Sequence, residues 1–389
     1  MTLPPPPTPY GGPHGQGYGG GPQWGSQQQP ATSGGQFGGP PPWGPPPGQP
    51  QWGGPPSGPP PKAGKGKWIL GGIIVALVVA LAVTITVLVV RPDSEGPSAN
   101  PPNGTDSEFA SANDTGPVNI ITEDPTCDAW GRVGRDYAGN LSRVNWDARD
   151  RSLPATAWTA QQKSMYAAAD AAMASASSQA EVLSTQTPHR VMRELYLQFE
   201  AYTSEFSRRI AGYVPEDDDL VAVSDAIGSA LSNICSSVDF GSAKSFAPRV
   251  PAPEAPTTIS ELKAGEPTQI FIDQPTPVCQ QWETAAQKFS DETAAWLAID
   301  PGIPAADWTP QQRSINDAVV PVMSESANEL EALSRESANS VLEDFGVLAA
   351  QYRRAFALAV PSYTPADGFL SQSAAFLVKS VVWACKAAE

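Results

Sequence analysis

The chain has 389 residues, enough for two or three domains, but its 42 Pro and 34 Gly are spread so unevenly that part of it cannot form a packed core. Residues 1–67 contain three lysines and no acid, so the net charge of −16 divides into +3 there and −19 in the rest. An acidic C-terminal part argues against binding to nucleic acid and against docking on anionic lipid.

The first segment, residues 1–67, consists almost entirely of Pro, Gly, Gln and Ser with isolated aromatic residues. It has too little aliphatic surface to offset the entropy lost on ordering, so we expect a disordered tail. Its Pro runs and spaced aromatic residues are typical of weak contacts with a cytoplasmic protein partner. A solubilising spacer is the alternative, and the composition fits both interpretations.

The next segment, residues 68–90, contains 23 residues without a charge. A helix of this length covers roughly 30 Å, which is enough to span a bilayer. Lys62, Lys65 and Lys67 precede the segment, whereas Arg91 is followed closely by acids. Because positive charge stays on the cytoplasmic side, the pattern predicts a single-pass cell-membrane protein with a cytoplasmic N-terminus and an extracytoplasmic C-terminal part.

The remainder of the chain is internally duplicated. Residues 146–235 and 296–385 agree at 23 of 90 positions when they are aligned without a gap. The agreement includes Trp, Pro, Tyr and Cys at fixed spacing, which chance similarity between Ala-rich helices does not produce. We therefore predict two helical repeats, at 127–238 and 279–389. Linkers rich in Pro, Ser, Thr and acids precede them at 91–126 and 239–278, and we expect these linkers to be extended spacers.

Each repeat is predicted to contain four amphipathic helices. Thr159 and Gln162 open the second helix of the first repeat as a capping box, and Thr309 and Gln312 do so in the second repeat. Apolar residues then recur in steps of three and four, as on the buried face of a helix; in the first repeat they are Met165, Ala169, Met173, Ala176, Ala180 and Leu183. The predicted fold class is all-α, with two tandem four-helix bundles after the tail and the transmembrane helix.

A cysteine marks the beginning and the end of each repeat: Cys127 and Cys235 in the first, Cys279 and Cys385 in the second. Four cysteines allow three pairings. The duplication favours one disulfide inside each repeat, Cys127–Cys235 and Cys279–Cys385, because a single ancestral copy would have been closed by its own bond. Such bonds persist outside the cytoplasm. We expect each bond to join the first helix to the fourth and each repeat to be an independent module.

Residues typical of catalysis are scarce. Of the two histidines, one lies in the tail, and His189 begins a helix where the second repeat has Asn339, so neither a metal site nor Ser-His-Asp catalysis is expected. The acids at 216–219 lack the alternation and the Gly of a Ca²⁺ loop and are typical of a helix start. Asp150 and Asp300 are expected to cap turns. We therefore expect no enzyme activity, no cofactor and no metal.

The tryptophans shared by the repeats are the remaining candidate binding residues. Trp146, Trp158, Trp296 and Trp308 lie near predicted helix ends. Aromatic residues in such places normally pack in the core with the indole N–H near water. Stacking on a sugar or lipid ligand is the alternative, so these four are candidate ligand-contact residues.

In layout, the Pro/Gly-rich tail, the Lys-flanked span and the Ala-rich, Cys-bounded exterior resemble the proline- and glycine-rich membrane proteins of mycobacteria and related Actinobacteria. The resemblance implies a cell-envelope location and no established activity. We expect a non-enzymatic envelope protein whose repeats bind an envelope component or a protein partner. The alternative is a carrier of a hydrophobic ligand within the bundles. A large apolar cavity would favour the carrier, and tight packing would favour partner binding.

Overall fold

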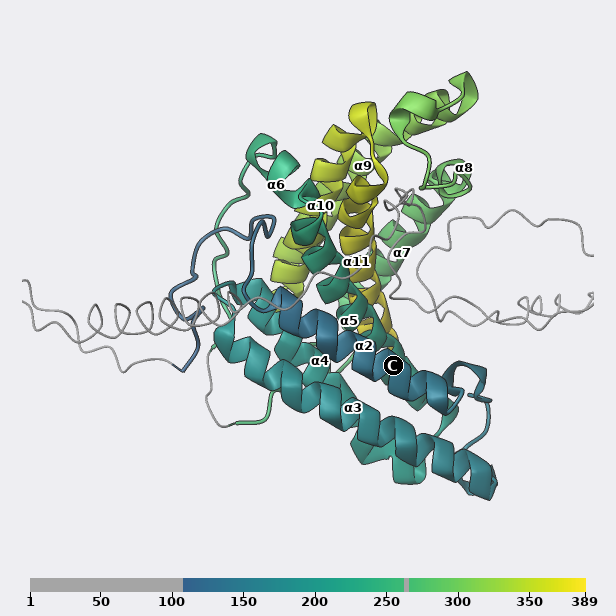
Figure 1. The fold of residues 1–389 in the computed structure, drawn as a ribbon. Helices are drawn as coiled ribbons and strands as arrows, with labels where there is room; N and C mark the ends of the chain where they lie inside the picture. The colour runs from purple at the N-terminus through teal and green to yellow at the C-terminus, as the bar shows by residue number, and fades with distance from the viewer. Residues whose placement is uncertain (1–107, 262–265) are drawn as a thin grey trace, which may run out of the picture. The chain divides into compact units, whose positions relative to one another are not determined.

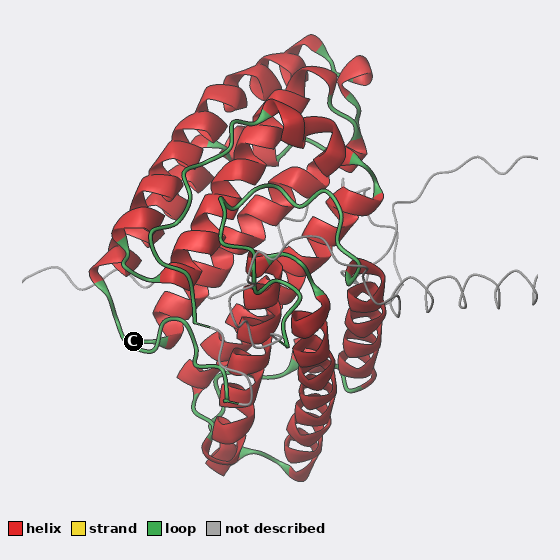
Figure 2. Cartoon of the chain, turned by 90° about the vertical axis from the view of Figure 1, so that its left-hand side faces the viewer, coloured by secondary structure: helices red, strands yellow, loops and turns green. Residues whose placement is uncertain are grey.

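A computed structural model of the chain describes residues 108–261 and 266–389, and the regular secondary structure of these residues is helical (Figure 1). Figure 2 shows the same residues as helices joined by loops. The predicted all-α fold is confirmed for this part of the chain. The predicted tail at 1–67 and the predicted membrane span at 68–90 lie outside the described residues, as do residues 91–107 of the first linker.

The two repeats contain matching helices. The first repeat comprises α2 (Cys127–Arg143), α3 (Ala160–Gln186), α4 (Arg190–Arg209) and α5 (Asp218–Asp239), with 3₁₀ turns at Trp146–Ala148, Ala155–Ala157, Ile210–Gly212 and Pro215–Asp217. The second comprises α7 (Pro277–Glu292), α8 (Ala294–Leu297), α9 (Pro310–Glu336), α10 (Ser340–Ala359) and α11 (Gly368–Ala387), with 3₁₀ turns at Ala305–Asp307, Val360–Ser362 and Pro365–Asp367. Between them lie α6 (Ser242–Phe246) and a 3₁₀ turn at Ala247–Arg249. Helices α3 and α9 both have 27 residues, and α4 and α10 both have 20, so the duplication is structural.

Each repeat forms a four-helix bundle. In the first repeat α2 contacts α3, α3 contacts α4, α4 contacts α5, and α5 returns to α2. Helices α7, α9, α10 and α11 form the same closed cycle in the second repeat. The cycle brings the apolar faces of four helices together in one interior, as the helical spacing of apolar residues predicts.

The predicted capping boxes are present at the starts of α3 and α9. The backbone N–H of Gln162 donates to Thr159 Oγ1 at 3.2 Å, and the backbone N–H of Thr159 donates to Gln162 Oε1 at 2.9 Å. Thr309 and Gln312 repeat both bonds. These bonds satisfy N–H groups that a helix start leaves without a partner, which explains why both helices begin where they do.

One disulfide closes each bundle. Cys127 is bonded to Cys235 and Cys279 to Cys385, with Cα–Cα distances of 5.2 Å and 5.5 Å. Each bond joins the start of the bundle's first helix to the C-terminal part of its fourth. The predicted pairing is therefore confirmed. An even number of antiparallel helices brings these two ends together, which allows the bond to form.

The two bundles pack against each other through their fourth helices. Helices α5 and α11 form the most extensive helix contact of the described residues (Figure 1), and α4 also contacts α10. The buried apolar residues of both repeats form one continuous core. The expectation of two independent modules is thus corrected. The fourth helices are apolar on more than one side, so each would expose apolar surface to water if its bundle stood alone. In the structure, α5 and α11 cover this apolar surface on each other.

The described parts of the linkers are packed on the bundles rather than extended away from them. Val118, Ile120 and Ile121 are buried, and Phe271 packs edge-on against Tyr202 at a centroid distance of 5.8 Å. The expectation of free spacers is therefore corrected for residues 108–126 and for the described residues of 239–278. The reason is the apolar side chains within these Pro-rich segments, which gain stability by burial.

Helices α5 and α11, each extended by the preceding 3₁₀ turn, are long and apolar enough by composition alone to cross a membrane. Most of that apolar surface is buried inside the helical unit, and each helix is tied to its bundle by a disulfide. Core helices of a folded domain have the same properties, so we treat both as part of the core.

Candidate functional site

The four candidate ligand-contact tryptophans lie in the core. Trp146, Trp158, Trp296 and Trp308 all have at most 9% of their surface exposed. The indole N–H of Trp158 donates to the Leu153 carbonyl at 2.9 Å, and that of Trp308 donates to the Ile303 carbonyl at the same distance. Trp158 and Trp308 therefore fasten the connections that precede α3 and α9, and all four rings are largely buried.

The residues that the repeats share build the same corner twice. The Tyr213 hydroxyl donates to the Arg151 carbonyl at 2.9 Å, and the Tyr363 hydroxyl donates to the Pro301 carbonyl at 2.8 Å. Trp158 lies tilted beside Tyr213, with ring centroids 5.3 Å apart. The shared Trp and Tyr spacing thus has a structural cause.

The acids that the sequence singled out also have structural roles. Asp150 Oδ1 accepts from the Ser152 N–H at 3.0 Å, and Asp300 Oδ1 accepts from the Gly302 N–H at 2.8 Å, as predicted for turn caps. In the run at 216–219, Asp217 accepts from the Val214 N–H at the helix start. Within residues 108–261 and 266–389, no group of three or more His, Cys, Asp or Glu side chains could hold a metal ion.

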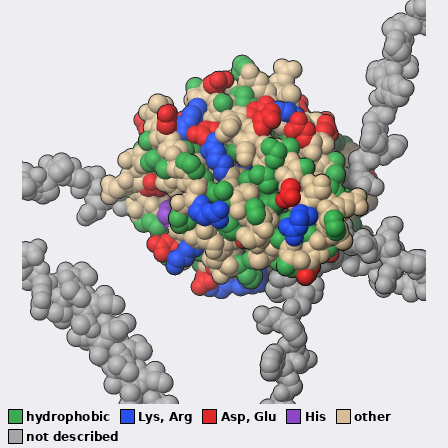
Figure 3. Space-filling view, turned by 90° about the horizontal axis from the view of Figure 1, so that it is seen from above, with side chains coloured by type: hydrophobic (Ala, Val, Ile, Leu, Met, Phe, Trp, Pro, Cys, Tyr) green, Lys and Arg blue, Asp and Glu red, His purple; other side chains and the backbone are tan. Residues whose placement is uncertain are grey.

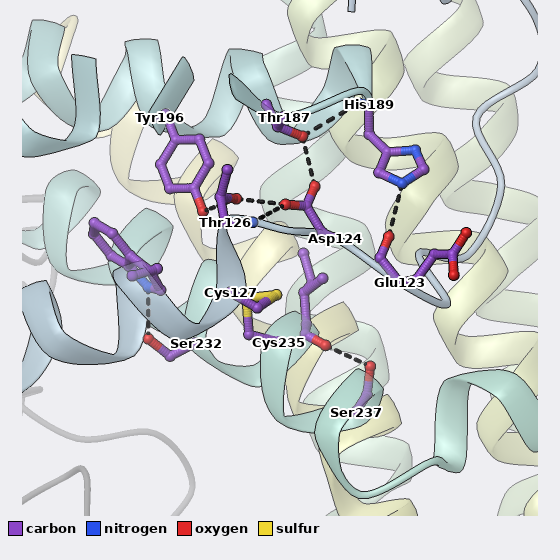
Figure 4. Close-up of a disulfide and its surroundings, with 12 residues drawn as sticks. Glu123, Asp124, Thr126, Cys127, Thr187, His189, Tyr196, Ser232, Cys235 and Ser237 are labelled. Carbon is purple, nitrogen blue, oxygen red and sulfur yellow. Dashed lines mark hydrogen bonds between the residues drawn. A yellow bond between two sulfur atoms is a disulfide. The ribbon is translucent and has the colours of Figure 1, made fainter. Parts of the chain in front are cut away.

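The surroundings of the first disulfide form a hydrogen-bonded clasp (Figure 4). Asp124 accepts from the N–H of Thr126 and from the hydroxyl of Thr187, which lies just before α4. The Thr126 hydroxyl lies 2.8 Å from the Tyr196 hydroxyl, and a His189 ring nitrogen lies 2.9 Å from the Glu123 carbonyl oxygen. The contacts of His189 are therefore those of a residue that fastens the segment before α2 to the start of α4.

A polar groove of about 360 Å³ lies between α3 and α4 of the first repeat. Hydroxyl groups and three charged side chains line it: Ser177, Ser178, Glu181, Glu200, Thr203, Ser204, Ser207 and Arg208, together with Ala174. Burial raises the pKa of the Glu200 carboxyl above its usual value, and the nearby Glu181 carboxylate raises it further, against the hydrogen bond from Ser204. The groove therefore places two carboxyl groups and one guanidinium group next to several hydroxyl groups.

The same region of the second repeat is bridged by an arginine. Arg354, which occupies the position equivalent to Ser204, donates to Glu331 Oε2 at 2.7 Å and to Asn328 Oδ1 at 2.8 Å. Glu331 is the equivalent of Glu181, and Asn328 is the equivalent of Ser178. Although burial opposes it, hydrogen bonds from Arg354 and Arg335 lower the pKa of the Glu331 carboxyl. The two repeats thus differ at this place in whether an arginine spans the groove.

A buried charge cluster joins α4 to α10 between the repeats. Arg190 Nε donates to Asp344 Oδ2 at 2.6 Å and its Nη2 to Asp344 Oδ1 at 3.1 Å, a two-point guanidinium–carboxylate pair. Glu194, at the position equivalent to Asp344, accepts from the Ser260 hydroxyl at 2.6 Å. Burial raises the pKa of the Glu194 carboxyl well above its usual value, and the charge of Asp344 raises it further. The cluster therefore links α4 of the first repeat to α10 of the second.

The family described as "Mycobacterial ESX-1 associated protein" matches residues 109–389, which include both repeats and the segment packed before α2. The chain belongs to this family. It is 38% identical over 336 residues to an uncharacterised protein of Mycolicibacterium smegmatis (strain MKD8), covering 84% of this chain and 88% of that protein. No solved structure matches the chain.

Membership of the ESX-1 associated family refines the resemblance drawn from the sequence. The mycobacterial relative agrees with an Actinobacterial origin. The family match begins at residue 109, so it does not depend on the Pro/Gly-rich tail on which that resemblance partly rested. It covers instead the helical unit, from the segment before α2 to the end of the second repeat.

Sequence reasoning did not identify the groove or the charge cluster. A signal for both was present, because aligning the repeats sets Ser204 against Arg354 and Arg190 against Ser340. Such a replacement indicates where two otherwise similar bundles differ in charge. It does not show which helices the side chains join.

Proposed function

We propose that this protein is a non-enzymatic component of the mycobacterial cell envelope whose two-repeat helical unit binds a protein partner in the ESX-1 secretion system. The observation that carries the proposal is the family match over residues 109–389. Because the match covers both repeats, we assign the partner contact to the helical unit. The tail at 1–67 would be an additional cytoplasmic interaction segment, as its composition predicts.

The packing of the bundles supports partner binding over a hydrophobic carrier. The cavity beside Trp296 and Met323 is only about 40 Å³ in volume, and the larger groove between α3 and α4 is polar. Pockets that enclose small ligands are typically several hundred Å³ and mostly apolar. Asp150 and Asp300 are held in turns and Asp344 in an ion pair, which supports a non-enzymatic role.

The proposed topology places the helical unit outside the cytoplasm, with one membrane helix at 68–90. The lysines before that segment support this orientation. The two disulfides also support it, because such bonds persist mainly in oxidising compartments. Figure 3 shows acidic and basic side chains interspersed over one face of the molecule, a pattern that suits a protein surface better than a nucleic acid.

The proposal is tested by crosslinking in intact mycobacterial cells. The tagged full-length protein would be crosslinked, solubilised and captured, and the bound proteins would be identified by mass spectrometry. We expect proteins of the ESX-1 system to be enriched over a control membrane protein with an unrelated extracytoplasmic domain. Equal recovery with the control would contradict the proposal.

A further inference from the structure

We propose that the groove between α3 and α4 of the first repeat receives an arginine side chain presented by the protein partner. The inference rests on the proposed function, because it names the surface and the chemistry by which a partner is bound. The supporting observation is a comparison of the two repeats. Both have a glutamate at this place on the second long helix, but only the second repeat has arginines that bind it.

In the second repeat, an arginine of the same chain occupies the equivalent place between α9 and α10. Arg354 extends from α10 to α9, where its guanidinium contacts Glu331 at 2.7 Å and Asn328 at 2.8 Å. Arg335 donates to the same Glu331 carboxylate at 3.1 Å. The carboxylate of α9 therefore has two guanidinium partners from its own chain.

The first repeat keeps the carboxylate and lacks both arginines. Glu181 stands where Glu331 stands, but Ser204 replaces Arg354 and Thr185 replaces Arg335. Among the described residues the Glu181 side chain has no ion pair, and it lies at the exposed rim of the groove. A second acid, Glu200, lines the same groove where the other repeat has only Ala350.

The remaining basic residue of the groove does not take the place of the missing guanidinium. Arg208 is paired with Glu205 on its own helix, and its side chain is 73% exposed. The space between Glu181 and Glu200 is lined with the hydroxyls of Ser178 and Ser204. A guanidinium suits this lining because it offers five N–H donors in one plane to carboxylates and hydroxyls at once.

A direct test uses the full-length protein in detergent and a small probe, N-acetyl-arginine amide. The matched control probe is N-acetyl-citrulline amide, which keeps the shape of the side chain without its charge. Saturation-transfer NMR should show a signal for the arginine probe that is severalfold stronger than for citrulline. Glu181→Gln should reduce it to the citrulline level, whereas Glu216→Gln, at an exposed acid outside the groove, should leave it unchanged.

A second test fills the groove from within. Ser204→Arg should restore the bridge to Glu181, abolish the signal of the arginine probe and raise the melting temperature by a few degrees. Adding Glu181→Gln should cancel that rise. Because Ser204→Arg is expected to stabilise the protein, loss of probe binding in this variant does not reflect unfolding.

Equal signals for the two probes, or an arginine signal that survives both Glu181→Gln and Ser204→Arg, would overturn the inference. If Glu181→Gln abolishes probe binding but crosslinking still recovers ESX-1 proteins unchanged, the proposed function stands and the partner binds elsewhere. If crosslinking recovers none while the probe binds, the groove stands and the proposed function fails.

Discussion

At the scale of single residues, the main departure from ordinary packing is the charge buried between the repeats. Arg190 is 1% exposed and Glu194 is 3% exposed, yet both carry ionisable groups. The cost of burying the Arg190 charge is offset by its two-point contact with the Asp344 carboxylate. Glu194 is compensated less completely, because it faces Arg193 at 3.7 Å and the Ser260 hydroxyl but also shares its surroundings with Asp344. Removing either compensation should have measurable effects.

The first prediction concerns Glu194 and pH. Because its pKa is raised in the folded protein above the ordinary value of 4.5, the folded state holds a proton that the unfolded state releases. Stability should therefore fall as pH rises from that ordinary value towards the folded pKa, by about 1.4 kcal/mol per pH unit. Glu194→Gln keeps an acceptor oxygen for Ser260 and removes the titration, so its advantage should grow with pH across this window and vanish below it.

The measurement is urea unfolding at a series of pH values, with Glu216→Gln as the control at an exposed position. The control should keep the pH slope of the natural protein. An unchanged slope in Glu194→Gln would show that Glu194 titrates normally in the folded state.

A second prediction compares a buried and an exposed ion pair. Arg190→Ala leaves the Asp344 carboxylate buried without its partner, which should cost about 3–5 kcal/mol. Lys288→Ala breaks the exposed pair between Lys288 and Glu325, N···O 2.8 Å, and should cost far less, because water screens an exposed ion pair. Both values come from denaturant unfolding followed by circular dichroism. Similar losses in the two variants would mean that the inter-repeat cluster contributes no more than a surface contact.

At the scale of helices, most boundaries follow from local chemistry. Thr and Gln three residues apart begin α3 and α9, and a Pro with an acid two residues later begins the turns before α5 and α11. How closely two helices approach each other depends instead on single small residues at their contact. A Cβ added to Gly346 of α10 would overlap Ser334 Oγ and lie 2.8 Å from a Trp282 ring atom, so only glycine permits this approach.

A third prediction uses this contrast. Gly346→Ala should destabilise the protein by about 1–3 kcal/mol, because the overlap outweighs the better helix propensity of Ala. Gly139→Ala in α2, where nothing lies within 4 Å of the added Cβ, should instead stabilise it by up to about 1 kcal/mol. Thermal unfolding of both variants tests the pair. A stabilised Gly346→Ala protein would mean that α9, α10 and Trp282 separate easily.

At the scale of the whole molecule, two bundles closed by their own disulfides share one core. A fourth prediction follows for the bonds. Each closes a loop of just over 100 residues, which in the chain-entropy description stabilises the folded state by roughly 4–5 kcal/mol. Reduction should lower the melting temperature and leave a helical circular dichroism spectrum below it. Cys385→Ala should act like reduction of one bond, and complete loss of helix at low temperature would contradict this.

A fifth prediction concerns the proposed topology. Alkaline phosphatase fused after residue 260 should be active, because the enzyme requires an oxidising compartment for its own disulfides. A fusion at residue 30 should be inactive, since the lysines before residue 68 keep that end in the cytoplasm. Activity at residue 30 without activity at residue 260 would reverse the orientation.

The sequence alone determined the parts of this protein that depend on short spacing or on duplication. Helical periodicity predicted the buried face of α3, capping boxes predicted where α3 and α9 begin, and the duplication selected Cys127–Cys235 and Cys279–Cys385. Each of these depends on residues a few positions apart or on a comparison of equal positions, so a linear pattern is sufficient.

Only the tertiary structure decided how the bundles meet. Arg190 and Asp344 are 154 residues apart in sequence, and their pairing depends on the crossing of α4 and α10, which no local pattern encodes. The linkers were expected to be spacers because their composition is Pro-rich, but a few apolar side chains were enough to pack them on the bundles. The groove between α3 and α4 likewise could be recognised as a candidate site only from the structure, which shows Arg354 bridging the equivalent place between α9 and α10. Contacts between residues far apart in sequence form when the free energy gained by burying apolar surface exceeds the conformational entropy lost. This sum over many residues cannot be read from a short stretch of sequence.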